Sequence, residues 1–168
     1  MLEIEPLNPA LVDAIVQRDG GNGWKNDPTG WVNILSQHNA GARLVLVASE
    51  AGAPVGYGSL VWRSGYPPFA DAGTPELHDL VTARSHRHQG VGTTLIASLA
   101  KSARNRGHTT IGLGVGLYAD YGPAQRLYAA LGYQPDGRGL TYQNGPVPPG
   151  ATIRADDDLI LWMVKNLA

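Results

Sequence analysis

Apolar and polar positions along the chain follow two alternating periods, which predict strands and helices in turn. A short strand is expected near Leu2 to Glu5, with helices over residues 9–19 and 28–38. The second helix has Asp27 as its cap and Pro28 at its first position. The β-rich runs RLVLVAS and VGYGSLVW are joined by the turn-like EAGAP, which predicts a hairpin.

The same alternation continues through the second half of the chain. Strands are expected in ELHDLVT, TTIGLGVG and DLILWMV, and helices over residues 90–106 and in YGPAQRLYAALGY. The Pro- and Gly-rich residues 64–75 are predicted to form a loop. Residues 154–158 are predicted to form a solvated turn, whose charge can also attract a cation. This order of strands and helices predicts a single α/β domain over residues 1–168.

Composition is ordinary for a soluble globular protein of 168 residues, with 43% hydrophobic and 16% charged. Thirteen basic and fourteen acidic residues leave a net charge of −1, so no broad positive field exists to hold a nucleic acid or an anionic membrane. The N-terminal MLEIEPLNPA lacks a signal-peptide pattern, and no apolar run approaches the roughly 20 residues of a membrane span. A cytoplasmic location is expected, and a homodimer is left open.

The sequence contains no cysteine, which narrows the chemistry. Disulfides, thiolate metal sites and a covalent mechanism through an enzyme cysteine are excluded. No metal site is expected. Any group transfer must be direct or use another nucleophile.

Residues 87–92 read RHQGVG and lie between a predicted strand and a predicted helix. The first N–H groups of a helix have no internal partner and lie at the positive end of its dipole, so glycines there let an anion approach. Arg87 can add a charged hydrogen bond. Two familiar phosphate-binding patterns, G-x-x-x-x-G-K-[ST] and G-x-G-x-x-G, are not matched. On these residues alone, a phosphate cradle and a purely structural turn both stay open.

Read together, LHDLVTARSHRHQGVGTTLIASLAKSARNRG and YGPAQRLYAALGYQPDG resemble the GNAT superfamily of acyl-CoA-dependent N-acyltransferases, over residues 77–134. The resemblance implies an α/β fold of three layers, with a mixed, mostly antiparallel sheet flanked by helices. It implies that backbone amides of the glycine turn bind the pyrophosphate of coenzyme A. It also implies that the fourth and fifth strands splay apart and that the fourth pairs with the pantetheine arm. The cofactor-binding residues that it implies are Leu80, Val81, Thr82, Arg87, His88, Gln89, Gly90, Val91, Gly92, Thr93, Tyr121, Ala124 and Tyr128.

Two positions depart from the family pattern. Tyr121 stands where many relatives have an asparagine, so a contact to the pantetheine arm is altered. His78 precedes Asp79 where several relatives have a glutamate, so a histidine becomes the candidate base. The three glycines of TTIGLGVG are costly in a strand and are expected where backbone parts or a ligand comes close; a weak edge strand is the alternative.

Deprotonating an amine acceptor is the larger chemical problem. An alkylammonium of pKa ~10.4 is almost fully protonated at pH ~7, whereas a thiol leaving group of pKa ~8.5 needs little help. His78 is the candidate base, directly or through a water, and Glu76 is the second candidate. Strand alternation sends Glu76 and His78 to one face and Asp79 to the other, unless a bulge intervenes. Tyr128 is the expected proton donor to the departing thiolate.

The acceptor is expected to bind between variable segments that carry aromatic and acidic residues, which suit a cationic, partly apolar amine. The candidate residues are Trp24, Trp31, Tyr66, Asp71 and Asp120. The chain is thus predicted to transfer an acetyl group from acetyl-CoA to a small primary amine by direct attack. Acetylation of a protein or peptide amine and a non-catalytic acyl-CoA-binding module are the alternatives.

Overall fold

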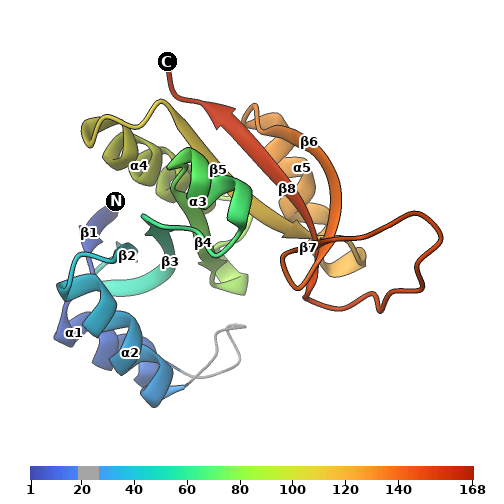
Figure 1. The fold of residues 1–168 in the computed structure, drawn as a ribbon. Helices are drawn as coiled ribbons and strands as arrows, with labels where there is room; N and C mark the ends of the chain where they lie inside the picture. The colour runs from blue at the N-terminus through green and yellow to red at the C-terminus, as the bar shows by residue number, and fades with distance from the viewer. Residues whose placement is uncertain (19–26) are drawn as a thin grey trace.

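The computed structural model of the chain describes residues 1–18 and 27–168, and its elements follow the predicted alternation (Figure 1). The first half contains β1 (Leu2–Pro6), α1 (Pro9–Gln17), α2 (Pro28–Asn39), β2 (Arg43–Glu50), β3 (Ala53–Val61) and α3 (Pro67–Ala72). The second half contains β4 (Glu76–Thr82), η2 (Arg84–His86), α4 (Val91–Asn105), β5 (Thr110–Gly116), η3 (Ala119–Tyr121), α5 (Gly122–Ala130), β6 (Gln134–Tyr142), β7 (Gly145–Pro146) and β8 (Leu159–Asn166).

The described strands form one eight-stranded sheet in the order β1-β2-β3-β4-β5-β8-β6-β7. β4 and β5 are parallel, and all other neighbours are antiparallel, which confirms the mixed, mostly antiparallel sheet. β4 pairs with β5 only at Glu76 with Gly112 and at Leu77 with Leu113. From His78 onward the two strands separate, so the fourth and fifth strands splay as the family resemblance implies.

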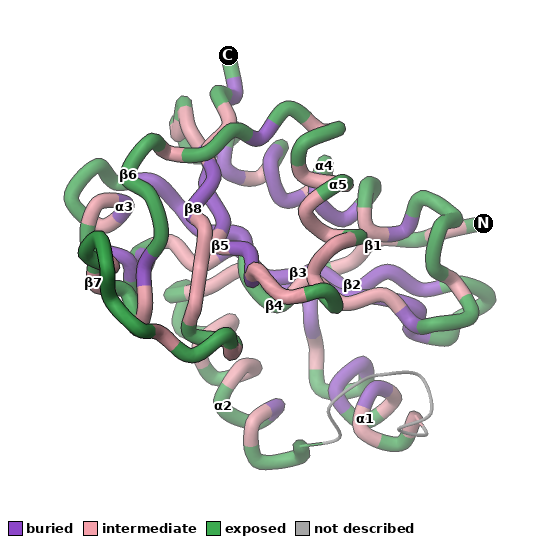
Figure 2. The backbone as a smooth tube through the Cα atoms, turned by 90° about the vertical axis from the view of Figure 1, so that its right-hand side faces the viewer, coloured by how far each residue is buried: buried purple, intermediate pink, exposed green. Residues whose placement is uncertain are grey.

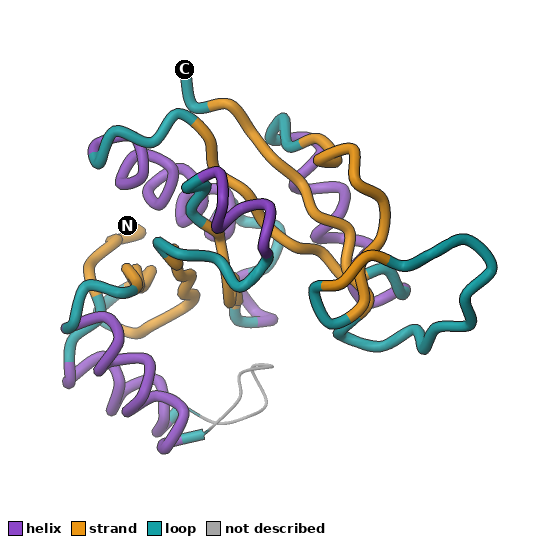
Figure 3. The backbone as a smooth tube through the Cα atoms, in the orientation of Figure 1, coloured by secondary structure: helices purple, strands orange, loops and turns teal. Residues whose placement is uncertain are grey.

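Both faces of the sheet are buried, which gives three layers (Figure 3). In β2, Val45 and Val47 belong to a core cluster shared with α1 and α2, whereas Leu46 and Ala48 belong to a cluster shared with α4. Alternate residues of a strand face opposite sides, so one strand serves both cores. No helix within residues 1–18 and 27–168 is long and apolar enough to cross a membrane.

The prediction of a loop over residues 64–75 is wrong for its central part, which forms α3. Two prolines open this helix, where their missing N–H groups cost no hydrogen bond, and Gly73 ends it with a φ of 65°. Phe69 is buried and contacts Trp162 of β8 edge to face, with ring centroids 5.3 Å apart. A high Pro and Gly content therefore marked the ends of a short helix rather than an irregular loop.

β6 and β7 have no counterpart in the predicted elements. β6 is mostly exposed, and the tube through β6, β7 and the long connection to β8 is largely green in Figure 2. The strand pairs with β8 on both sides of a register shift between Pro135 and Leu140. An exposed, interrupted strand next to the sheet edge carries no regular apolar alternation, so residues 134–142 show no pattern that predicts a strand.

The three glycines of β5 make room for side chains. A Cβ at Gly112 would lie 2.2 Å from the Phe69 ring, and one at Gly116 would lie 2.3 Å from the Tyr121 ring. At Gly114 it would meet Ile160 at 2.8 Å and Trp162 at 3.1 Å. Neighbouring side chains therefore fill the space that a Cβ would take at each glycine. Gly114 and Gly116 also lie beyond the last residue pair of β4 and β5, where the two backbones part as the sequence predicts, and Gly114 lines the cavity that opens there.

Candidate active site

A cavity of about 740 Å³ opens where β4 and β5 separate. One wall is β4, from Glu76 to Leu80, and α4 and α5 contribute Ile96, Leu99 and Tyr128. The opposite wall, called the acceptor wall below, comes from three places. These are Gly65 and Tyr66 just before α3, Gln143 and Asn144 in the turn between β6 and β7, and Asp157, Asp158, Ile160 and Trp162 before and within β8. Elements far apart in the sequence thus converge on one space.

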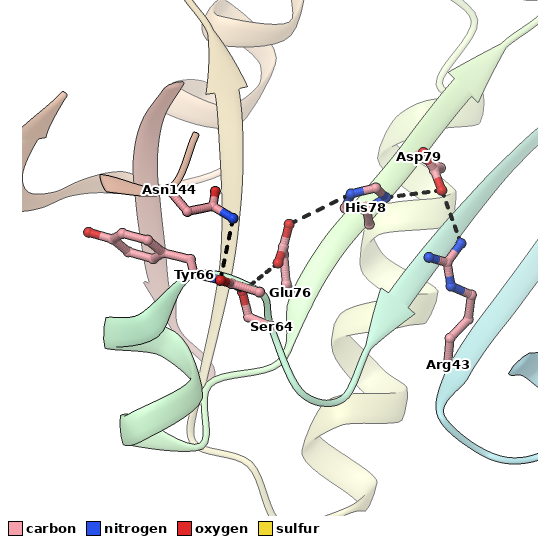
Figure 4. Close-up of polar contacts among 8 residues, drawn as sticks. Arg43, Ser64, Tyr66, Glu76, His78, Asp79 and Asn144 are labelled. Atoms are coloured by element: carbon pink, nitrogen blue, oxygen red, sulfur yellow. Dashed lines mark hydrogen bonds and ion pairs between the residues drawn. The ribbon is translucent and has the colours of Figure 1, made fainter. Parts of the chain in front are cut away.

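Four charged or titratable side chains and one hydroxyl form a chain of contacts along the β4 wall (Figure 4). Arg43 Nη1 donates to Asp79 Oδ2 at 3.0 Å, and His78 Nδ1 lies 3.0 Å from the same oxygen. His78 Nε2 lies 4.0 Å from Glu76 Oε1, and Ser64 Oγ donates to Glu76 Oε2. Glu76 is buried, whereas the His78 side chain is 47% exposed.

A β-bulge brings Asp79 to the His78 side of the strand. The pairing of β3 with β4 shifts between Tyr57 and Ser59, which oppose Val81 and His78. Asp79 itself has a φ of 51°, in the left-handed region that side chains other than glycine rarely occupy. The bulge is the exception that the expectation from strict alternation had allowed, and it places neighbouring residues side by side.

The contacts shift the ionisation of both members of the His78–Asp79 pair. The hydrogen bond to Asp79 raises the pKa of His78 above its ordinary value, against the opposing effect of burial. Burial opposes ionisation of Asp79, but the hydrogen bond and charge of His78, together with Arg43, outweigh it and hold the pKa of Asp79 below its ordinary value. The pair therefore favours an anionic Asp79 and a more basic His78.

Tyr128 lines the cavity from α5 and packs edge to face against Tyr133, with ring centroids 6.0 Å apart. Burial raises the pKa of Tyr128 to about 12. The phenol therefore stays protonated at neutral pH and is available as a hydrogen-bond donor. The Tyr133 hydroxyl is buried and has no hydrogen-bond partner within the described residues.

The glycine turn places the start of α4 beyond the end of β4. Gly90 has a φ of 84° and accepts the first intrahelical hydrogen bond, which Thr94 N donates at 2.9 Å. The N–H groups of residues 91–93 precede that bond and have no helical partner. Gly92 has ordinary space around it, with a Cβ 3.7 Å from both Leu127 and Thr82.

The side chains of the turn mostly hold the turn itself. Arg87 Nε donates to Thr82 O at 3.4 Å, and Gln89 Nε2 donates to Ser85 O at 2.9 Å. His88 has a φ of 60°, so this turn combines two left-handed residues, His88 and Gly90. Of the other predicted cofactor residues, Leu80, Tyr121 and Tyr128 line the cavity, Val91 is buried in the core, and Val81, Thr82, Thr93 and Ala124 lie outside the lining.

The predicted acceptor residues separate into three groups. Tyr66 lines the cavity and stacks on Trp162, with ring centroids 4.2 Å apart. Its hydroxyl donates a hydrogen bond of 2.8 Å to Asp136 Oδ2. Trp31 does not line it, because α2 turns this ring into the core, edge to face with Tyr57. Asp71 and Asp120 are exposed on α3 and η3 and are also absent from the described lining. Trp24 lies outside the described residues.

Sequence reasoning missed the acidic residues that do line the cavity, Asp157 and Asp158. Asp157 accepts hydrogen bonds from the hydroxyls of Tyr118 and Tyr121, the latter at 2.8 Å. The run RADDD predicts a solvated turn whose charge can attract a cation, but nothing local in it indicates that the turn returns to this cavity. The departure from the family's asparagine at Tyr121 was a usable signal, since its hydroxyl reaches this turn.

A model of the acetyltransferase (GNAT) family matches residues 14–133, and the chain belongs to this family. No curated protein matches the sequence. Among solved structures, a Salmonella typhimurium protein with its cofactor acetyl-CoA shares 21% identity over 100% of this chain and 95% of its own, with a TM-score of 0.70. An aminoglycoside 6'-acetyltransferase type Ii shares 24% identity over 99% and 97%, with a TM-score of 0.68. A ribosomal-protein-alanine N-acetyltransferase from Brucella melitensis shares 25% identity over 98% and 99%, with a TM-score of 0.69.

Proposed function

We propose that the chain transfers an acetyl group from acetyl-CoA to a primary amine of a small cationic molecule by direct attack. One observation carries the proposal: His78 of β4 and Tyr128 of α5 line a single cavity where β4 and β5 separate. Membership of the acetyltransferase (GNAT) family supports the reaction class. Because the sequence has no cysteine, no enzyme thiol can carry the acetyl group.

Acetyl-CoA, when bound, supplies the thioester that the amine attacks. Two features of this chain fit it. Beyond Leu77 the backbone of β4 is not paired with β5, which leaves Leu80 to Thr82 to pair with an extended pantetheine arm. The helix start after Gly90 presents N–H groups without helical partners, which suit a pyrophosphate. Arg87 lies beside this start and adds positive charge.

His78 and Tyr128 have separate proton roles in this proposal. His78 Nε2 takes the proton from the acceptor amine, because an alkylammonium of pKa ~10.4 cannot attack while protonated. Its pairing with Asp79 makes it the stronger base. Tyr128 holds its proton at neutral pH and donates a hydrogen bond where the departing sulfur gathers negative charge. Glu76, bonded to Ser64 and near His78, stays the second candidate for the base.

The charge of the cavity walls supports a cationic acceptor. Carboxylates reach the cavity from both sides, Glu76 and Asp79 on β4 and Asp157 and Asp158 before β8, and no lysine or arginine lies in the described lining. Tyr66 and Trp162 add an aromatic surface. Such a lining attracts an ammonium group and repels an anion.

The test is release of free thiol from acetyl-CoA, measured with a thiol reagent while amines are offered. The panel contains monoamines, diamines, aminoglycosides and short peptides with free N-termini. Because the chain has no thiol of its own, the protein adds no background to the assay, and samples without protein give the spontaneous release. The proposal expects thiol release with small cationic amines. Turnover with peptides alone would favour the second candidate, which the Brucella ribosomal-protein-alanine enzyme motivates. Coenzyme A binding without turnover on any amine would contradict catalysis.

A further inference from the structure

We propose that Asp79 is a positioning residue for His78, whose carboxylate holds the imidazole by Nδ1 and turns Nε2 to the cavity as the proton acceptor. The inference goes beyond the proposed function by assigning how the base is oriented, and it rests on that function only for the source of the proton. Its basis is the local geometry of β4. The contact between Asp79 Oδ2 and His78 Nδ1 is 3.0 Å long.

The backbone is arranged to make this contact. Neighbouring residues of a regular strand point to opposite faces, so Asp79 would otherwise lie across the sheet from His78. The bulge opposite Tyr57 and Ser59, with Asp79 at a φ of 51°, removes that separation. Asp is one of the few side chains that enter the left-handed region, where glycine is usual. A conformation of this kind at a cavity wall points to a functional constraint on the side chain.

The contact fixes which ring nitrogen can act as a base. An ionised carboxylate only accepts hydrogen bonds, so Nδ1 must be the donor to Asp79. In the neutral ring Nε2 then carries the lone pair. Nε2 lies 4.0 Å from Glu76 Oε1, beyond a hydrogen bond, and the His78 side chain is 47% exposed, so an acceptor nitrogen can reach it from the cavity.

Arg43 completes the arrangement from β2. Its Nη1 donates to the same Asp79 oxygen at 3.0 Å, and its side chain is only 13% exposed. The guanidinium fixes the carboxylate in place and keeps it ionised. The other charged and titratable groups that bear on this pair or line the same cavity are Glu76 on β4, Tyr57 on β3, Tyr128 on α5, Tyr66 before α3, Tyr121 on η3, and Asp157 and Asp158 before β8.

The direct measurement is the titration of the His78 ring by NMR in the ligand-free protein. The chain has five histidines, and the His78 signals are those that disappear in His78→Gln. Asp79→Asn is expected to lower the ring pKa, because it removes the anionic partner. Arg43→Gln is expected to raise it, because it removes a nearby positive charge. An unchanged His78 pKa in Asp79→Asn overturns the proposal.

Kinetics separate positioning from a merely structural role in the bulge. Glycine adopts a φ of 51° more readily than aspartate, so Asp79→Gly keeps the backbone conformation of the bulge while it deletes the carboxylate. We expect kcat/KM for the best amine to fall about 10²-fold in this variant, the low end of the ~10²–10⁴ range for general acid–base catalysis, with coenzyme A affinity unchanged. In Asp79→Asn the acidic limb of the pH profile should move to lower pH. Parental kcat/KM in Asp79→Gly overturns the proposal.

The two measurements also distinguish this inference from the proposed function. If the parent protein releases no thiol with any amine, the proposed function fails, whereas the NMR titration still decides whether Asp79 controls the protonation of His78. If the parent turns over amines and the titration shows no coupling, only the positioning role fails. Thermal melting of each variant confirms that the fold is intact.

Discussion

The two walls of the cavity are built in different ways. The β4 wall takes Glu76, His78 and Asp79 from one short strand. Asp79 contacts His78 and is also bound by Arg43 of β2. The opposite wall takes Asp157 and Asp158 from the turn before β8, held partly by tyrosine hydroxyls. The residues of a wall formed by one strand can be predicted from the local sequence. The residues of a wall formed by a distant connection depend on how the chain folds. We assign proton transfer to the first and recognition of acceptor charge to the second.

The largest effect should come from the β4 wall. His78→Ala is expected to lower kcat/KM for the amine by about 10²–10⁴-fold near neutral pH, because the base is lost. The deficit should shrink as pH rises toward the amine's pKa of ~10.4, because the free amine then needs no base. The measurement is kcat/KM for parent and variant across this pH range.

Glu76→Gln is the matched control, since it keeps the size of the second candidate base and removes its charge. If His78 is the base, the Gln variant should lose less than the Ala variant, and its deficit should show no such convergence with pH. A deficit of His78→Ala that stays constant from neutral to alkaline pH would contradict the base assignment and favour Glu76.

Tyr128→Phe should have the next largest effect. The variant keeps the ring and its packing on Tyr133 but loses the only polar atom that the side chain brings to the cavity. A loss of about 10²-fold in kcat is expected, at the lower end of the range for acid–base groups, because a thiolate is already a fair leaving group. Titration calorimetry should show coenzyme A affinity unchanged. Parental kcat would remove the hydrogen-bond donor role and leave positioning of the reactants as the main source of rate.

The packing beneath the acceptor wall gives a prediction about stability. A Cβ at Gly112 would overlap the Phe69 ring, so Gly112→Ala should lower the free energy of unfolding by about 1–3 kcal/mol. Gly122 is the matched control: it is helical, with a φ of −51°, and no atom lies within 4 Å of an added Cβ. Gly122→Ala should be neutral or stabilise the protein by about 0.4–1 kcal/mol. Urea unfolding of both variants measures the difference, and equal stabilities would contradict the packing argument.

The same contrast between local and distant construction explains what the sequence could predict of the fold. α4 was expected over residues 90–106 and spans Val91–Asn105, because its apolar stripe recurs at helical spacing and faces one core. β6 was not expected, because it is exposed and gains its strand geometry from pairing with β8. Pairing with a distant strand leaves no periodic trace in the paired residues themselves.

The candidate site residues show the same difference between local sequence signals and distant packing. The family pattern predicts His78 and Tyr128, and strand alternation adds Glu76 on the same face as His78; all three line the cavity. Trp31 was chosen for its chemistry alone, yet the face of α2 that carries it packs on Tyr57. Side-chain type indicates what a residue can bind, whereas only tertiary packing decides which space it faces. The bulge at Asp79 likewise depends on tertiary packing, since no residue pattern in β4 predicts it.

Coenzyme A binding at the glycine turn, residues 87–92, should depend more on the backbone conformation of the turn than on its charged side chain. Gly90 has a φ of 84°, where valine is strained by about 1–3 kcal/mol, so Gly90→Val should re-aim the helix start and weaken coenzyme A binding about tenfold or more. Arg87→Ala should cost less, because its guanidinium is exposed and one of several donors. Calorimetric titration with coenzyme A compares the two. Gly92→Val should have a milder effect than Gly90→Val, because the neighbours of Gly92 leave ordinary space for a Cβ.

The smallest effect should come from the acceptor wall. Asp157→Asn keeps an oxygen that can accept the hydrogen bonds of Tyr118 and Tyr121, but removes one negative charge from the cavity. Because Asp157 is exposed, the lost attraction should be about 0.2–1 kcal/mol, which is roughly a 1.4- to 5-fold rise in KM for a cationic amine, with kcat unchanged. Added salt should reduce the difference from the parent, because it screens exposed charges.

Asp120→Asn is the matched control for that substitution, since it removes the same charge from an exposed residue of η3 that does not line the cavity. If the cavity wall recognises charge locally, KM should rise in Asp157→Asn and stay near the parental value in Asp120→Asn. Equal rises in both variants would show that only the overall field of the protein matters. A fall in kcat with KM unchanged would instead place Asp157 with the β4 wall, in the chemistry rather than in recognition.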